Sequence, residues 1–348
     1  MYRKVITLII PAWKEQLDVK LRNLEWLQLP ENGLQVIFIC SESVVVPPVF
    51  AERGIRVHFL LEQERKGKAV AINAAMKQVD TPLVIFHDAN TELQPDSILH
   101  LCKAFSDPTI GGVAGEKRVQ TDRNHPGALE GYYWKYESAW KRRDANFYSV
   151  IGGAGELFAI RTELFEPLPE DCILDDMELS WQVISKGYRI AYAPQAVTTE
   201  PPSESLKVES IRKIRIATGA YQFLDRHSLL SIFRVSFRYG IQFLFRKWLR
   251  WVIWPLLTLS MPLIVWVALW YFPEPESTRK LGIVFGGILT ISVAGGLLSF
   301  LRVRVGWLGI PFYFLFIQYC QIRGWFRYHL GNPTVLWEKS DRSRNTLR

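Results

Sequence analysis

Two oxygen-bearing side chains in one short stretch have the chemistry of a divalent-cation site. An apolar run over residues 83–86 leads to Asp88, and Asn90 follows two positions later. If the run is a buried strand that ends in a tight turn, both side chains reach one rim of a sheet. Mg²⁺ and Mn²⁺ prefer such oxygens and commonly join protein carboxylates to substrate phosphates. A solvated Asp-Ala-Asn turn would have the same sequence, so both interpretations stay open at this point.

Charged residues elsewhere could bind a nucleoside diphosphate. Lys68 stands near the start of a predicted helix over residues 66–77, with Asn73 a turn and a half further on. A helix N-terminus attracts phosphate groups. Glu15 follows a predicted strand and Pro11, where its carboxylate could accept hydrogen bonds from a nucleobase or a ribose. Ordinary surface charge would explain each of these residues taken alone.

An acidic pair begins another predicted helix, over residues 175–186. Of Asp175 and Asp176, one carboxylate can cap the helix while the other projects into a cleft. A plain capping pair is the alternative. His87, just before Asp88, is either a partner of the cation site or a hydrogen-bonded core histidine.

These residues need a scaffold, and the apolar pattern predicts one. Short runs rich in β-branched residues alternate with helical patterns, and the runs lie at residues 5–10, 36–40, 57–61 and 83–86. Such alternation predicts an α/β fold with a largely parallel sheet. Ligands of such sheets bind beyond the carboxyl ends of the strands. Three motifs stand at those ends: Pro11-Ala-Trp13-Lys-Glu15, Ser41-Glu42 and Asp88-Ala-Asn90.

The middle of the chain contains a small-residue turn, Gly152-Gly153-Ala154-Gly155. Glycine there would let the backbone approach a ligand closely. An aromatic amphipathic helix is predicted before the turn, over residues 128–142. A basic helix with Arg212 and Arg215 is predicted after it, over residues 207–224.

The last third of the chain is predicted to meet a membrane. Residues 251–273, 281–301 and 305–322 lack any charge. At ~1.5 Å per residue the first two windows are long enough for a ~30 Å hydrocarbon core. The third is short and contains Pro311, so we expect it to be re-entrant or interfacial. Buried helices of a soluble protein are the alternative.

The distribution of charge agrees with a membrane surface. Net charge is +8, and basic residues flank the apolar windows, which favours membrane-surface anchors over a nucleic-acid footprint. The expected anchors are Arg234, Arg238, Arg246, Lys247, Arg250, Arg302, Arg304 and the basic residues of the tail from Arg323 to Arg348. The N-terminus does not resemble a signal peptide, and the four cysteines have neither disulfide nor metal-ligand spacing. We therefore expect the N-terminal two thirds and the basic tail on the cytoplasmic side.

Taken in order, these motifs resemble those of the membrane-associated family 2 glycosyltransferases, which have a GT-A nucleotide-sugar-binding fold. The matching segments are residues 9–15, 66–73, 88–90, 151–161, 174–176, 187–192 and 212–222. Each motif alone has low specificity. The ordered set, which spans roughly residues 5–225, is distinctive.

This resemblance implies an inverting transfer of a sugar from a nucleoside diphosphate sugar, with UDP as the expected nucleotide. Asp176 would be the general base beside Asp175, and Asp88 and Asn90 would bind Mg²⁺ or Mn²⁺. The residues expected to contact the donor are Pro11, Trp13, Glu15, Glu42, Lys68, Asn73, Asp88 and Arg215. Those expected to contact the acceptor are Gly153, Ala154, Gly155 and Arg212.

Three departures from the family pattern bear on the product. The second strand ends in Cys40-Ser41-Glu42, where many members have a base-reading aspartate. The metal triplet ends in Asn90 and not in aspartate. Ile216 stands where processive synthases have a tryptophan, so processive synthesis does not follow from the sequence.

The expected organisation is a GT-A domain over residues 1–227, an interfacial helix over 228–250, two or three transmembrane helices over 251–325 and a basic tail over 326–348. A multi-pass protein of the inner (plasma) membrane would result. The favoured hypothesis is transfer to a polysaccharide or a lipid at that membrane. Single-sugar transfer to a lipid or polyprenyl carrier is a narrower alternative. A third possibility is an inactive scaffold of a polysaccharide export complex, with export subunits as partners.

Overall fold

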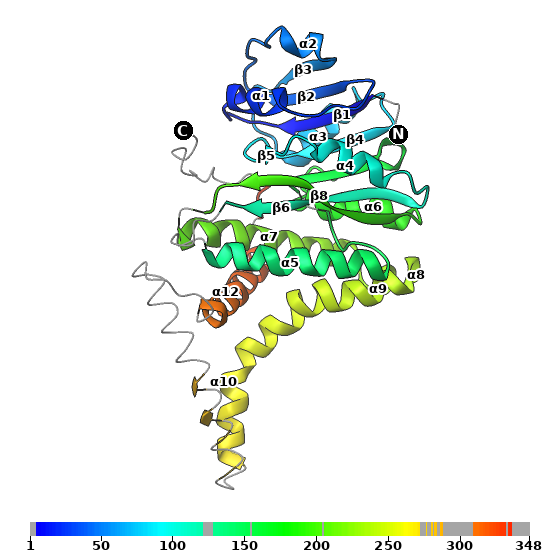
Figure 1. Ribbon diagram of the computed structural model, residues 1–348. Helices are drawn as coiled ribbons and strands as arrows, with labels where there is room; N and C mark the ends of the chain where they lie inside the picture. Colours follow the sequence, from blue (N-terminus) through cyan, green and yellow to red (C-terminus); the bar gives the residue numbers. More distant parts are fainter. Residues whose placement is uncertain are drawn as a thin grey trace.

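One eight-stranded sheet forms the centre of the molecule (Figure 1). The computed structural model describes residues 5–120, 128–153, 155–203, 205–271, 276, 280, 282–283, 286–287, 309–331 and 333–335. Strand order across the sheet is β3-β2-β1-β4-β7-β6-β8-β5. The strands are β1 (Ile6–Pro11), β2 (Leu34–Cys40), β3 (Ile55–Leu61), β4 (Leu83–His87), β5 (Glu92–Leu93), β6 (Ile110–Val119), β7 (Leu157–Arg161) and β8 (Arg189–Glu200).

The sheet is parallel in its first half and mixed in its second. β1 pairs in parallel with β2 and β4, and β2 with β3. β7 is antiparallel to β4 and β6, and β5 is antiparallel to β8, whereas β6 and β8 are parallel. The predicted α/β fold is confirmed, but the sheet is mixed: beyond β4 the predicted parallel pairing recurs only between β6 and β8. Because His87 at the end of β4 lies opposite Leu157 at the start of β7, the turn before β7 reaches the carboxyl edge of the parallel half.

Apolar layers cover both faces of the sheet, which explains why its inner strands are nearly continuous hydrophobic runs. Leu8 and Ile10 of β1 lie in one layer and Ile9 lies in the other. The first layer contains α1 (Leu17–Glu25), α2 (Val49–Glu52) and α4 (Ser97–Ala104). The second contains α3 (Lys68–Met76), α6 (Asp175–Ser185) and the 3₁₀ turn Thr162–Leu164.

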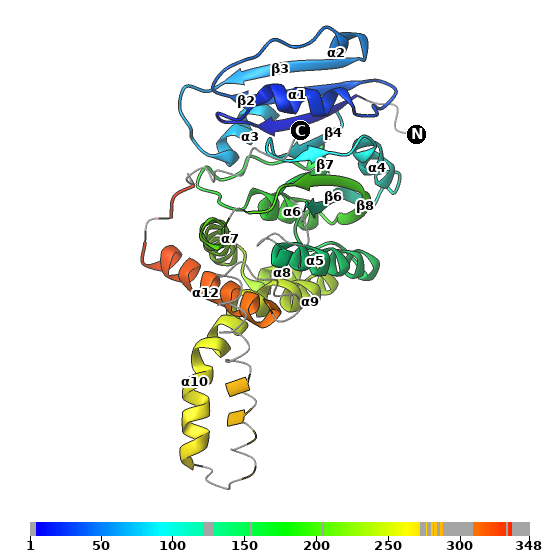
Figure 2. The ribbon, with the colours of Figure 1, turned by 60° about the vertical axis from the view of Figure 1, so that its left-hand side comes forward.

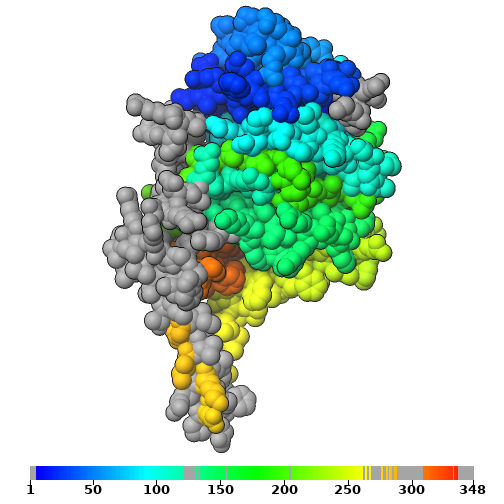
Figure 3. Space-filling view, viewed as in Figure 1, coloured from blue at the N-terminus to red at the C-terminus, as the bar shows by residue number. Residues whose placement is uncertain are grey.

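Further helices form a layer beneath the sheet, and one of them projects away from the body (Figures 2 and 3). They are α5 (Ala128–Phe147), α7 (Leu206–Arg226), α8 (Leu229–Val235), α9 (Phe237–Phe243), a π-helical segment (Leu244–Ile253), α10 (Trp254–Tyr271) and α12 (Gly309–His329). The projecting helix is α10, and α12 packs against α7. The expected boundary at residue 326 falls inside α12.

The segment predicted as one interfacial helix, residues 228–250, is divided. Ser236 adopts an extended backbone conformation, and its hydroxyl accepts a backbone N–H of α9, so a new helix begins there. Arg246 was expected to anchor the chain at a membrane surface. It is instead buried in ion pairs with Glu137 at 3.1 Å and Asp144 at 2.8 Å, so that expectation is wrong.

Among the described residues, no helix combines the length and the apolar character that a membrane crossing requires. Residues 251–271 of the first apolar window lie in the π-helical segment and α10. Most of the second window, residues 281–301, lies outside the described residues. The third contributes to α12, which packs against α7. The multi-pass arrangement stays a prediction.

The contact between α12 and α7 can be tested. A Cβ added at Gly324 would lie 2.4 Å from the Cβ of Ala217 and 2.9 Å from the backbone nitrogen of Thr218. We expect Gly324→Ala to push the helices apart and to lower the free energy of unfolding by roughly 1–3 kcal/mol, measured by denaturation in detergent. Ile310→Ala truncates a side chain that is 53% exposed on the same helix and should cost less than about 0.5 kcal/mol. An unchanged free energy for Gly324→Ala would contradict this packing.

Candidate active site

The Lys68 ammonium joins three elements at the carboxyl edge of the parallel strands. Nζ lies 2.8 Å from Oδ1 of Asp88 after β4 and 3.0 Å from Oδ2 of Asp175 at the start of α6. It also donates to the backbone oxygen of Gly155 at 3.4 Å. Burial disfavours the charged ammonium, but Asp175 and Asp88 more than offset this and raise the pKa of Lys68. The fold therefore places the charged ammonium of Lys68 between Asp88 and Asp175, two carboxylates of the predicted site.

Hydrogen bonds from the buried Lys20–His87 pair fix the turn that contains Asp88. His87 Nδ1 donates to the backbone oxygen of Glu156 at 2.6 Å, and its Nε2 accepts from the ammonium of Lys20. Lys20 also donates to the backbone oxygens of Thr91 and, at 3.4 Å, Asp88. Burial, with Lys20 beside the ring, holds the pKa of His87 well below its usual value. His87 is thus a hydrogen-bonded core histidine that also positions the turn.

Lys20 was not predicted, although the sequence contains a signal for it. Among the buried residues of α1 are Leu17, Leu21 and Leu24, and Lys20 lies on the same face. A lysine on the apolar face of a helix needs an acceptor inside the protein. Burial lowers the pKa of Lys20 to about 7.

Asp176 is left as the carboxylate that faces the glycine turn. A Cβ on Gly155 would lie 3.8 Å from Cγ of Asp176. Within the described part of the chain, its carboxylate has neither an ion pair nor a hydrogen bond, because Lys68 is held by Asp175. Burial, assisted by the charge of Asp175, raises the pKa of Asp176 to about 6. Such a group can accept a proton near neutral pH.

The glycine turn is locked against α6. Gly152 has φ +83°, and a Cβ there would lie 2.5 Å from Sδ of Met177. The backbone nitrogen of Gly153 donates to Oγ of Ser180 at 2.6 Å. Ala154 lies outside the described residues. At the end of this turn, the carbonyl of Gly155 faces Lys68. The Cα of Gly155 faces Asp176.

The remaining donor-side residues gather at the same edge. Trp13 and Glu15 follow β1, next to β4, and both are partly buried. Glu42 is exposed just after β2. Arg215 of α7 donates to the backbone oxygen of Ile173 at 3.4 Å. Burial lowers the pKa of Arg215, and the charges of Asp175, Asp88 and Asp176 oppose that shift.

Two predicted residues have structural contacts instead. The Asn73 amide donates to the backbone oxygen of Leu168 at 2.7 Å and accepts from its nitrogen at 2.8 Å, which fixes the loop before α6. Arg212 is partly buried and forms ion pairs with Glu130 and Glu209. Donor binding by Asn73 and acceptor binding by Arg212 stay predictions, and these contacts do not support them.

The predicted cation ligands fit an ion that is held mainly by its substrate. The described residues contain no group of three or more His, Cys, Asp or Glu side chains able to hold a metal. Asp88 offers one carboxylate that is 32% exposed, and Mg²⁺ is commonly bound by one or two carboxylates plus substrate phosphates. Asn90 donates to Oε1 of Glu200 at 3.3 Å. An aspartate at position 90 would therefore face a second carboxylate.

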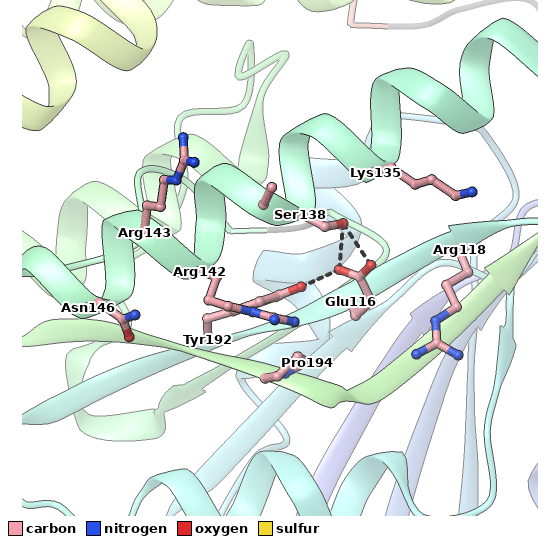
Figure 4. Close-up of a pocket in the computed structure, with 10 residues that line it drawn as sticks. Glu116, Arg118, Lys135, Ser138, Arg142, Arg143, Asn146, Tyr192 and Pro194 are labelled. Atoms are coloured by element: carbon pink, nitrogen blue, oxygen red, sulfur yellow. Dashed lines mark hydrogen bonds between the residues drawn. The ribbon is translucent and has the colours of Figure 1, made fainter. Parts of the chain in front are cut away.

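A separate pocket of about 450 Å³ opens between α5, β6 and β8 (Figure 4). Inside it, the carboxylate of Glu116 accepts hydrogen bonds from Ser138 at 2.7 Å and from Tyr192 at 2.5 Å. The basic residues of its lining are Arg118, Lys135, Arg142 and Arg143. Since none of the described site residues lines this pocket, it does not belong to the constellation around Lys68.

Comparison with protein families agrees with this arrangement of residues. The model described as "Glycosyltransferase like family 2" matches residues 3–219. A poly-beta-1,6-N-acetyl-D-glucosamine synthase of Staphylococcus aureus is 29% identical over 169 residues, which cover 47% of this chain and 41% of that protein. The probable glycosyltransferase YdaM of Bacillus subtilis is 23% identical over 249 residues, covering 66% and 58%. The chain thus spans about half the length of these relatives.

A solved structure has a similar fold. The mannosyltransferase PcManGT from Pyrobaculum calidifontis, in complex with GDP-Man and Mn²⁺, superimposes with a TM-score of 0.68 over 94% of this chain and 88% of that one. Sequence identity is 19%. At that identity the likeness establishes a GT-A-like fold.

The two adjacent aspartates should differ in their effect on stability. Asp175→Asn removes an ion-pair partner of the partly buried Lys68 and should lower the free energy of unfolding by roughly 2 kcal/mol at pH 8. Because the folded state raises the pKa of Asp176 to about 6, its contribution to stability is complete below ~4 and is lost as the pH rises through 6. Asp176→Asn should therefore be at least as stable as the wild type at pH 8, and the difference should vanish near pH 4. Equal destabilisation by both variants at pH 8 would contradict the assignment of the Lys68 ion pair.

Proposed function

The chain belongs to glycosyltransferase family 2, and from this premise we propose that it is an inverting, metal-dependent hexosyltransferase acting at a membrane. It moves a sugar from a nucleoside diphosphate sugar, with UDP as the nucleotide, to a hydroxyl of a polysaccharide or lipid acceptor. The S. aureus relative is named as a synthase of an N-acetylglucosamine polymer, which supports a UDP-linked donor and a carbohydrate product.

One observation carries the proposal. Lys68 holds Asp88 and Asp175, and Asp176 is left beside the glycine turn with a pKa raised to about 6 by burial and Asp175. Inversion requires a base on the acceptor side of the sugar, and a base works best when its pKa lies near the operating pH. The position of Asp176 beside the glycine turn and its raised proton affinity support this role.

The same cluster would stabilise the leaving diphosphate. Its negative charge grows as the sugar departs, and fixed cations aimed at that charge lower the barrier. Lys68, at the N-terminus of α3, and Arg215 of α7 would supply such cations, and the charge of Asp175 acts on both. A divalent ion on Asp88, with Asn90 beside it, would neutralise further charge when bound.

An exposed apolar surface supports the membrane part of the proposal. Trp254, Leu263 and Trp266 of α10 are 48%, 62% and 61% exposed. Phe237 of α9 and Phe245 of the π-helical segment are 68% and 66% exposed. Several large apolar side chains exposed on neighbouring elements indicate an interaction surface. Aromatic residues of this kind favour the interface of a bilayer.

Single-sugar transfer to a lipid carrier is the second candidate. Ile216 stands where processive synthases have tryptophan, and α7 therefore lacks the aromatic side chain expected to hold a growing chain. An inactive scaffold is less well supported, because the cations and carboxylates that the reaction needs lie together around Lys68.

Release of the nucleotide from a panel of donors tests the proposal. Purified full-length protein in detergent with Mn²⁺ should release UDP from one of UDP-N-acetylglucosamine, UDP-glucose or UDP-galactose, and less nucleotide from GDP-mannose. The rate should rise with pH through about 6, because Asp176 must lose its proton. Asp176→Asn should reduce transfer about 10²–10⁴-fold with donor binding retained. A variant that keeps more than half of the wild-type rate would exclude Asp176 as the base.

The cation site makes a separate prediction. Asp88→Asn should weaken the Mn²⁺-dependent binding of UDP at least tenfold in calorimetric titrations, since the proposed carboxylate ligand is lost. Asp96→Asn removes a carboxylate that pairs with His100 at 3.1 Å on α4 and should leave that binding unchanged. If Asp88→Asn titrates like the wild type, the triplet is only a turn.

A further inference from the structure

Three basic residues of the π-helical segment, Arg246, Lys247 and Arg250, face the catalytic domain. Two of them form ion pairs, and Lys247 forms none with the described residues. Arg246 pairs with Glu137 and Asp144, and Arg250 pairs with Glu137. Among the residues that the structure describes, the ammonium of Lys247 has no carboxylate within ion-pair distance and no hydrogen-bond acceptor. Its Nζ lies 5.5 Å from the centroid of the Trp251 ring.

This ammonium lies at the glycine turn of the site. A Cβ placed on Gly152 would be 3.8 Å from Nζ of Lys247 and 3.9 Å from its Cε. The other end of the same turn, Gly155, faces Asp176. Three residues of chain span at most ~10 Å. Lys247 and the proposed base therefore border one short stretch of the acceptor side.

The surroundings of Lys247 are unfavourable to a cation. Burial lowers its pKa to about 8, and the neighbouring charges of Arg250 and Arg246 act in the same direction, while Glu137 and Asp176 oppose them. A partly buried charge without a hydrogen-bonded partner destabilises a fold. An anionic group of a bound ligand would compensate the positive charge of the Lys247 ammonium.

The chain around Lys247 indicates what that ligand is. The π-helical segment continues directly into α10, whose apolar side chains are exposed. A ligand with an apolar chain along α10 would carry its head group to Lys247. Lysine binds phosphate as a point charge. A neutral polysaccharide would leave the ammonium without a partner.

We propose that Lys247 forms an anion subsite that binds the phosphate of a lipid-linked acceptor and thereby positions the acceptor hydroxyl at Asp176. The assignment rests on the proposed sugar transfer and names the acceptor class for it. Lys247 is a positioning residue, and it has no part in the chemistry of the donor.

Binding of a matched pair of probes tests the subsite. Farnesyl phosphate and farnesol, each in detergent with UDP present, differ only in the phosphate. The wild-type protein should bind the phosphate at least tenfold more tightly than the alcohol. Lys247→Met should abolish that preference without weakening farnesol binding, and Lys247→Arg should keep it. Arg238→Gln removes an exposed cation from the neighbouring helix α9 and is the matched control, for which the preference should persist.

Two further measurements separate this subsite from its alternatives. Inorganic phosphate alone should bind at least tenfold more weakly than farnesyl phosphate, and equal binding would make the site one for free phosphate and overturn the lipid assignment. Lys247→Met should not lower the unfolding temperature, because it removes a repelled cation, so a lost preference would not reflect unfolding.

A wild-type protein that binds both probes equally, or a Lys247→Met variant that keeps the preference, would refute the subsite. If no donor in the panel is turned over while the Lys247-dependent preference persists, the sugar transfer and the acceptor role of the subsite are refuted, and only a binding site for a lipid phosphate remains. Failure of the sugar transfer can therefore be told apart from failure of phosphate binding at Lys247.

Discussion

The site depends on one shared ammonium. Asp88 and Asp175 come from different elements, a strand end and a helix start, and their charges would repel each other without Lys68 between them. At an effective dielectric of about 20, each contact near 3 Å is worth roughly 5 kcal/mol before desolvation is subtracted. Desolvation removes much of this gain, but removal of the cation would leave two carboxylates unbalanced. The same contact brings α3, β4 and α6 to the edge where the glycine turn lies.

Buried polar contacts recur within the sheet and within the helical layer beneath it. Lys117 of β6 pairs with Glu156 and Glu200 directly beneath the Asn90 turn. Glu209 of α7 accepts from Tyr313 of α12 at 3.1 Å. Partly buried charge pairs contribute less to net stability than their number suggests, but they penalise any other register. The helices beneath the sheet are consequently aligned with the site by polar contacts as well as by apolar packing.

Local patterns predicted much of the site, and contacts between distant segments explain what they missed. Lys68, Asp88 and Asp175 each stand at the end of a predicted strand or the start of a predicted helix, so their common edge follows from an α/β sheet. The antiparallel insertion of β7 has no local signature, because its apolar run would suit either direction. Asn73 and Arg212 have the residue types of a binding site, but their partners in the fold are backbone groups and buried carboxylates. Lys247 was predicted as a surface anchor, since its distance to the glycine turn is invisible in sequence.

The position of β7 also affects the order in which the chain can fold. β4 pairs with β1, which precedes it by about seventy residues, and its other edge stays unpaired until β7 is available. During synthesis the parallel half therefore emerges with an apolar strand edge exposed, and such an edge can pair with another chain. The buried Lys20–His87 pair finds its Glu156 carbonyl only when the segment before β7 arrives. The edge that carries Asp88 is thus completed only after β7 has emerged, and β8 joins the sheet later still, so nascent chains are vulnerable to aggregation before the site can assemble.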